Sequence, residues 1–69
     1  MNLNEIQAIV AQPTIPEKVR KEVVDTSREY IIDEKDVEVI VDVRMIFIDV
    51  YNSHGRRIDR IGIKLNRKW

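Results

Sequence analysis

The side chains best able to do chemistry in this sequence are basic residues near its C-terminal end. The closing stretch "NSHGRRIDRIGIKLNRKW" contains six Arg or Lys and one Asp, whereas the whole chain has a formal net charge of zero. Clustered cations beside aromatic groups can bind phosphates and stack on bases. Nucleic-acid binding is therefore one expected function, with Tyr51 and Trp69 as stacking groups. Its candidate contacts are Arg56, Arg57, Arg60, Lys64, Arg67 and Lys68.

Signals for catalysis and for metal or cofactor binding are weak. His54 is the only histidine and there is no cysteine, so one chain cannot form a two-histidine or thiolate metal site. Ser53 lies beside it in a stretch typical of a tight turn, which favours a turn role over a nucleophile. The carboxylates Asp33, Glu34 and Asp36 lack the glycine and terminal glutamate of a calcium loop. We expect no enzyme activity, no metal and no cofactor.

The composition is that of a small folded protein. The chain has 69 residues, of which 35% are charged and 43% hydrophobic, and we expect one domain over residues 1–69. Four charged residues interrupt the longest apolar stretch, residues 37–51, so no segment is predicted to cross a bilayer. The start "MNLNEIQAIV" lacks the features of a signal peptide, and together with the absence of cysteine this predicts a cytoplasmic protein.

Charge is distributed unevenly along the chain. Residues 1–50 carry six basic and eleven acidic groups, whereas residues 51–69 carry six basic groups and one acidic group. The two parts therefore have net charges of −5 and +5. Such asymmetry can indicate a binding surface, and the alternative is that the two parts pack together so that their charges compensate.

The first segment predicts a helix over residues 3–11. Apolar residues from Leu3 to Val10 recur at helical spacing, Asn2 lies three residues before Glu5 as in a capping box, and Pro13 follows. The short run "IQAIVA" also fits a strand, which would add a third strand to the sheet.

A second helix is predicted over residues 15–30. Thr14 lies three residues before Glu17, again the spacing of a capping box, and Pro16 falls in the first turn, where proline is tolerated. An apolar stripe then repeats at intervals of four residues, and it contains Ile15, Val19, Val23 and Ser27.

The stretch "VEVIVDVRMIFIDVY" is rich in β-branched residues and predicts one long strand over residues 37–51, followed by a return strand over 56–66. Between them, Asn52 and Gly55 suit a three-residue loop with a bulge, which pairs Asn52 with Arg56. Continuing that register sets Val50 opposite Ile58 and, less favourably, Asp49 opposite Asp59. A two-residue turn is the alternative, and it would shift the pairing by one residue.

Alternation along residues 37–51 predicts two faces. One face would carry Val37, Val39, Val41, Val43, Met45 and Phe47 against the helices. The other would carry apolar residues that two helices cannot also cover, and these form the expected protein interface: Ile40, Ile46, Ile48 and Val50. We therefore expect a homodimer, which either shares a four-stranded sheet or stacks sheet on sheet, because a hairpin with an open apolar edge and face tends to associate.

One resemblance bears on these expectations. The stretch "RKEVVDTSREY" (20–30), followed by "IIDEKDVEV", resembles the helix-to-strand junction of the MinE family of bacterial cell-division topological specificity factors. "IQAIVA" loosely resembles the segment that precedes that junction in the family. The resemblance covers about a third of the chain and implies a dimer formed by a sheet backed by helices.

Together these patterns predict an α+β fold, with two N-terminal helices and a long antiparallel β-hairpin that shares a sheet in a dimer. The expected function is that of a small non-enzymatic protein-binding or regulatory module acting through a β-sheet surface. Nucleic-acid binding through the basic C-terminal strand is the alternative, and a MinE-like cell-division regulator is a minor one.

Overall fold

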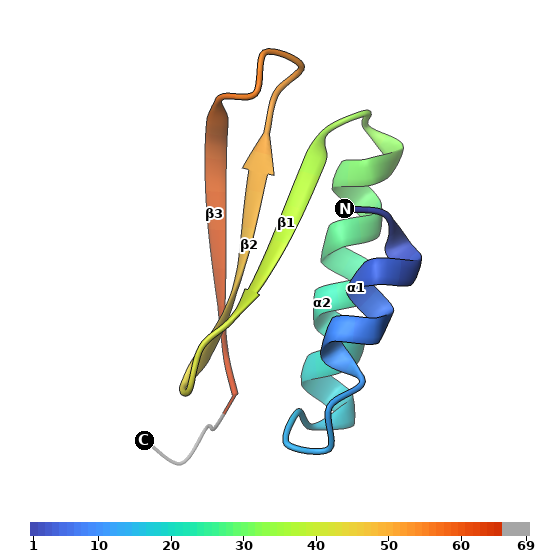
Figure 1. The fold of residues 1–69 in the computed structure, drawn as a ribbon, viewed down its shortest axis with the longest axis vertical. Coiled ribbons are helices and arrows are strands. Elements are labelled where there is room, and N and C mark those ends of the chain that lie inside the picture. The colour runs from blue at the N-terminus through green and yellow to red at the C-terminus, as the bar shows by residue number, and fades with distance from the viewer. Residues whose placement is uncertain (66–69) are drawn as a thin grey trace.

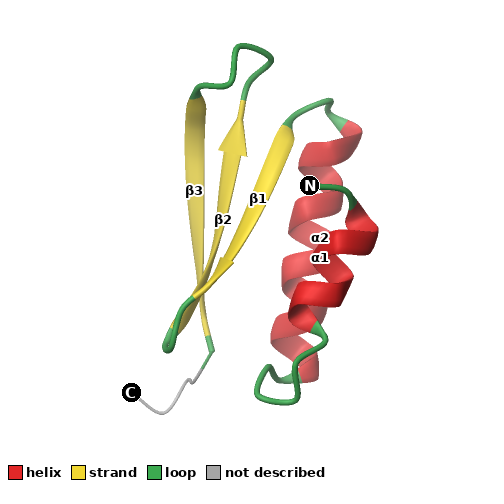
Figure 2. Ribbon diagram, in the orientation of Figure 1, coloured by secondary structure: helices red, strands yellow, loops and turns green. Residues whose placement is uncertain are grey.

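Two helices lie against one face of a three-stranded antiparallel sheet (Figure 1). The computed structural model describes residues 1–65. The elements follow one another as α1 (Leu3–Val10), α2 (Glu17–Ile32), β1 (Asp36–Val41), β2 (Met45–Tyr51) and β3 (Arg57–Lys64). The strand order is β1-β2-β3, and short loops join neighbouring strands (Figure 2). The predicted α+β class is confirmed. No helix among residues 1–65 is long and apolar enough to span a membrane.

Helix α1 begins at the predicted capping box. The Glu5 N–H donates to Asn2 Oδ1 (2.9 Å), and the Asn2 N–H donates to Glu5 Oε1 (3.1 Å). These two bonds satisfy backbone donors that the first helical turn leaves without partners. Ile6 and Val10 are buried on the side of α1 that faces the core. The segment is therefore a helix, and the alternative strand is wrong.

Helix α2 begins two residues later than predicted, and Thr14 does not cap it. Its N-cap is Pro16, which has no side-chain cap hydrogen bond. A residue that precedes proline is disfavoured in the helical region, so Ile15 cannot join the helix. The Ile15 N–H instead donates to the Gln12 carbonyl (3.0 Å) in a turn. The predicted stripe is confirmed, since its members from Ile15 to Ser27 are buried.

The C-terminus of α2 turns sharply into β1. The Lys35 N–H donates to the Tyr30 carbonyl (3.0 Å) and the Glu34 N–H to the Ile31 carbonyl (3.0 Å), which together form a Schellman motif. This motif needs a left-handed residue, and Glu34 has φ 61°. Residues with a Cβ atom are disfavoured there.

Replacing Glu34 with glycine is expected to stabilise the fold. Glycine removes the strain of the left-handed backbone, while it raises the entropy of the unfolded chain, so we expect a net gain of about 0.5–1 kcal/mol. Urea unfolding of Glu34→Gly beside Glu29→Gly measures the difference. Glu29 lies inside α2, where glycine should destabilise by about 1 kcal/mol. Equal effects of the two substitutions would contradict the assignment.

The prediction of one strand over residues 37–51 is wrong, because the chain reverses at residues 42–44. The Asp42 N–H donates to the Met45 carbonyl (2.8 Å), and Val41 pairs with Ile46. The Asp42 carboxylate accepts from the Val43 N–H (2.7 Å) and supports the turn. With this reversal, odd-numbered residues of β1 share a face with even-numbered residues of β2.

This change of face overturns the predicted interface. Ile46, Ile48 and Val50 have 0% exposure and lie in the core with Val37 and Val39, under the helices. They therefore do not form an accessible surface. Burying each of these side chains contributes about 1.5–3 kcal/mol. A single long strand would have left the same three residues on a face that no helix covers.

The β2–β3 loop has the predicted conformation. The Asn52 N–H donates to the Arg56 carbonyl (2.9 Å), the Gly55 N–H donates to the Asn52 carbonyl (3.0 Å), and Gly55 has φ 76°. The Asn52 side chain also accepts from the N–H groups of His54 and Arg56 (2.9 and 3.0 Å). Asx turns of this kind are a common role of asparagine in loops.

A bulge beyond this loop changes the predicted register. Tyr51 pairs with Arg57, but the next pair is Val50 with Asp59, so the predicted pairing of Val50 with Ile58 is wrong. The shift brings Arg60 opposite Asp49, where the predicted register had set Asp59. An attractive pair of charges therefore replaces a repulsive one.

Candidate functional site

The face of the sheet turned away from the helices is the candidate functional site, and we call it the outer face. In Figure 1 both helices lie on one side of the sheet, and no described element lies on the other. The strand register arranges the outer face in four rows, each running from β1 through β2 to β3. The rows are Asp36–Tyr51–Arg57, Glu38–Asp49–Arg60, Ile40–Phe47–Gly62 and Asp42–Met45–Lys64.

An ion pair links β2 and β3 on the outer face. Arg60 Nε donates to Asp49 Oδ1 (2.6 Å) and Arg60 Nη2 to Asp49 Oδ2 (3.0 Å), a bidentate geometry. Arg57 Nη1 lies 3.9 Å from the same carboxylate. Asp49 is only 2% exposed, although no helix covers this face. The hydrogen bonds from Arg60 hold the pKa of Asp49 below its ordinary value, although burial acts in the opposite direction.

The Arg60 guanidinium also contacts an aromatic ring. Its Cζ lies 5.0 Å from the centre of the Phe47 ring, which is within the range of cation–π attraction. Next to Phe47, Gly62 leaves β3 without a side chain. A Cβ atom there would lie 2.7 Å from Met45 Cε and 3.6 Å from Phe47 Cε1. Met45 and Phe47 therefore lean over Gly62 and form an apolar centre with Ile40, which is 38% exposed.

The charges of the outer face are sorted by strand. The β1 side carries the exposed residues Asp36, Glu38 and Asp42, and the β3 side carries Arg57, Arg60 and Lys64. The two groups are separated by β2 and so lie about 10 Å apart in the hydrogen-bonding direction.

The acidic side of this face has no ion pair within residues 1–65. Moreover, Glu38 lies directly opposite Asp49 in the register, a like-charged neighbour. Two like charges opposite each other are unfavourable, and Arg60 and Arg57 lie beside Asp49 but do not pair with Glu38.

The predicted nucleic-acid contacts are only partly brought together. Arg57, Arg60 and Lys64 lie on the outer face, with Tyr51 in the row of Arg57. Arg56 lies in the β2–β3 loop. The predicted contacts Arg67 and Lys68, and the predicted stacking group Trp69, lie outside the described residues.

Of the predicted interface residues, Ile40 alone lies on the outer face. The residues that sequence reasoning missed are Met45, Phe47 and Asp49, which it had placed against the helices or left without a partner. Their one local signal was the unfavourable pair of Asp49 with Asp59 in the predicted register, which pointed to a shift between β2 and β3.

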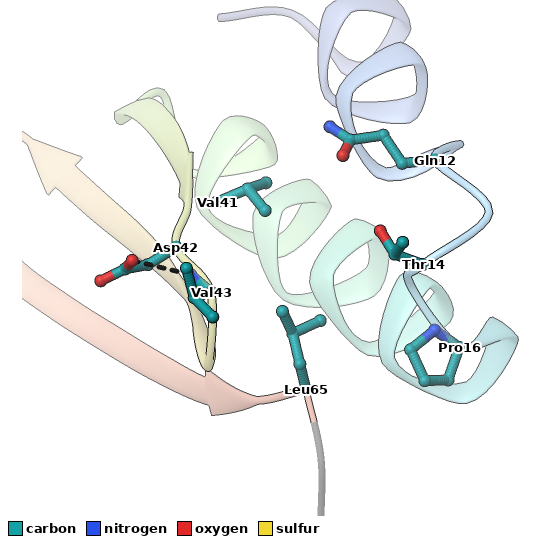
Figure 3. Close-up of a pocket in the computed structure, with 7 residues that line it drawn as sticks. All are labelled: Gln12, Thr14, Pro16, Val41, Asp42, Val43 and Leu65. Carbon is teal, nitrogen blue, oxygen red and sulfur yellow. Dashed lines mark hydrogen bonds between the residues drawn. The ribbon is translucent and has the colours of Figure 1, made fainter.

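A recess opens between the two layers, at the end of the sheet near the α1–α2 loop (Figure 3). Its volume is about 670 Å³, and its lining includes Thr14, Pro16, Val41 and Leu65. In Figure 3, Val41 and Leu65 point toward the helices, whereas Asp42 points away from them. The recess has no group of three His, Cys, Asp or Glu side chains, and none gathers elsewhere in residues 1–65.

No family model, no curated protein and no solved structure matches this chain. The resemblance of residues 20–39 to the MinE family stays a prediction.

Proposed function

We propose that this chain is a small non-enzymatic protein-binding or regulatory module that acts through the outer face of its sheet, as a homodimer. The observation that carries the proposal is the apolar centre of that face, open on the side away from the helices and flanked by opposite charges on its two outer strands. Interfaces commonly combine an apolar or aromatic centre with a charged rim.

The contacts among the side chains of this face support a role in binding. The bidentate pair of Arg60 with Asp49 and the contact of Arg60 with Phe47 link three side chains to one another within the single chain. Surfaces whose side chains are already ordered lose less entropy when a partner binds. The outer face therefore has features of a preorganised protein contact surface.

Nucleic-acid binding is the weaker candidate. Arg57 lies opposite Tyr51 and Arg60 lies over the Phe47 ring, and cations beside aromatic rings are what a single-stranded nucleic acid would require. However, the carboxylates of Asp36, Glu38 and Asp49 lie on the same face and balance these cations. A polyanion would be repelled by the acidic β1 side while it bound the basic β3 side. A partner that carries both signs of charge could form attractive pairs with both sides.

Replacing Ile40 with glutamate is expected to abolish self-association while the fold is kept, because Ile40 is partly exposed at the apolar centre. Sedimentation velocity over a concentration series measures the association. Ile32→Glu is the matched control, since Ile32 is 74% exposed on α2, away from the outer face. A wild-type protein that stays monomeric up to about 0.5 mM would overturn the homodimer, since that concentration detects even weak complexes.

Fluorescence anisotropy with labelled single-stranded RNA and duplex DNA tests the weaker candidate in the same samples. Tight binding that falls steeply with salt, and that Lys64→Glu reduces, would favour nucleic acid over protein as the partner.

A further inference from the structure

We infer that the partner on the outer face is a second copy of this chain, stacked face to face about a two-fold axis that runs parallel to β2. In this arrangement β1 of each copy lies over β3 of the other, and the two β2 strands lie over each other. The inference rests on the proposed function and gives it an orientation.

The four rows of the outer face determine which residues would meet. A two-fold axis along β2 keeps each row at the same height and exchanges its β1 and β3 ends. Asp36 then faces the partner's Arg57, Glu38 faces the partner's Arg60, and Asp42 faces the partner's Lys64. At their β1 and β3 ends the three charged rows thus meet charges of opposite sign, twice in each dimer, whereas Asp49 lies near the axis and is already paired with Arg60 of its own chain.

The uncharged row fits the same arrangement. Ile40 faces the partner's Gly62, the one residue of this face on β3 that has no side chain. At that position the Met45 methyl group and the Phe47 ring cover the backbone, so Ile40 would contact an apolar surface. Stacked sheets pack about 10 Å apart and are rotated by about 30°, so the β2 residues lie near the axis, and the rows at the two ends of the sheet are displaced from their partners by distances that long side chains can span.

The other face-to-face arrangement is electrostatically unfavourable. A two-fold axis perpendicular to the strands would place β1 over the partner's β1 and β3 over the partner's β3. The three carboxylates of one copy would then face those of the other, and the cations likewise. Like charges brought together at an interface disfavour association strongly, so the charge pattern selects the axis parallel to β2.

A second copy would also relieve a defect of the single chain. Glu38 lies opposite Asp49, and no cation among the described residues pairs with Glu38. In the stacked dimer the partner's Arg60 would lie over Glu38, while each Asp49 keeps its hydrogen bonds from Arg60 of its own chain. The pair of Asp49 and Arg60 would then contribute to a network across the interface as well as to the sheet.

The size of the outer face indicates a weak dimer. Three strands of about seven residues cover roughly 23 Å by 14 Å. This footprint is smaller than the roughly 800 Å² per partner of a typical stable complex. We therefore expect a dissociation constant on the order of 10–100 µM, so the association must be measured at high concentration.

Charge reversal in one row tests the orientation. Lys64→Glu and Asp42→Lys are each expected to weaken the dimer about tenfold or more, because each places two like-charged pairs in the interface. The double variant, which exchanges the two charges, is expected to recover the wild-type dissociation constant within about threefold, because the attractive pairs return with reversed sign. Sedimentation equilibrium gives the dissociation constants.

The control is Lys21→Glu, which makes the same change of charge at an exposed site on α2 and should leave the dimer unchanged. Thermal melts show whether Asp42→Lys keeps its fold, because it loses the hydrogen bond to Val43. If it does not fold, Lys64→Glu decides alone. This substitution would weaken the stacked dimer with its axis parallel to β2. It would strengthen the arrangement with its axis perpendicular to the strands, in which residue 64 lies near the partner's Arg57.

The outcomes separate the inference from the proposed function. A dimer that Ile40→Glu abolishes, but that neither charge reversal weakens, would retain the outer face as the contact surface and overturn the orientation. A wild-type chain that stays monomeric would overturn both. A dimer that none of these variants affects would place the contact elsewhere, for example at a sheet edge.

Discussion

Replacing Ile48 with alanine is expected to lower the free energy of unfolding by about 2–5 kcal/mol. Ile48 has 0% exposure and lies in the middle of the central strand, between Val39 on β1 and Ile61 on β3. Its truncation would leave a cavity under the helices, where few atoms can move to fill it. Urea unfolding followed by circular dichroism measures the change.

The matched control is Ile40→Ala on the outer face. Ile40 is 38% exposed, so its truncation should lower the free energy of unfolding by less than about 1 kcal/mol. This comparison is made at a protein concentration well below the dissociation constant of the dimer. The comparison tests the division of residues 37–51 into two strands, because one continuous strand would place Ile40 and Ile48 on the same face. Equal losses for the two variants would contradict the structure.

Replacing Asp49 with asparagine is expected to lower the melting temperature by several degrees at neutral pH. The carboxylate is buried and accepts two hydrogen bonds from Arg60. An amide of the same shape has one acceptor atom, and its NH₂ group would face the guanidinium donors of Arg60. Asp36→Asn is the control, since Asp36 is exposed and no ion pair to it is found within residues 1–65.

The effect of Asp49→Asn should depend on pH in a defined direction. Because the pKa of Asp49 is lowered in the folded state, its carboxylate stabilises the fold above the unfolded-state pKa of about 3.9. That contribution is lost as the pH falls through the lower, folded-state pKa. The difference in melting temperature between wild type and Asp49→Asn should therefore be constant near pH 7 and shrink below about pH 4. A difference that grows on acidification would contradict the assigned pair.

These two variants also separate stability from binding. Ile48 belongs to the core, so its truncation should affect the fold and leave the chemistry of the outer face unchanged. Asp49 affects both the stability of the fold and the proposed contact surface, because it is hydrogen-bonded to Arg60 on that surface. For this reason the charge reversals that test the dimer use Asp42 and Lys64, which do not contact this pair.

The sequence by itself determined the elements whose signals are local. The capping box of Asn2 and Glu5 and the apolar spacing of α1 lie within a few residues of one another, and each was predicted correctly. The β2–β3 loop was predicted for the same reason, because Asn52 and Gly55 fulfil its backbone requirements within five residues. The start of α2 was the exception, since the restriction that Pro16 places on Ile15 outweighed the spacing of Thr14 and Glu17.

Only the tertiary structure decided where the long β-rich stretch reverses and which of its faces is buried. Residues 42–44 contain no glycine, proline or asparagine, and β-branched residues fit a continuous strand as well as a hairpin. The reversal is favoured because it brings Ile46, Ile48 and Val50 beside Val37 and Val39, on the single face that two helices can cover. That preference depends on contacts between distant residues, as does the bulge that places Arg60 opposite Asp49. A side-chain period of two residues makes each such shift exchange the faces completely, so the outer face could be defined only once the strands were paired.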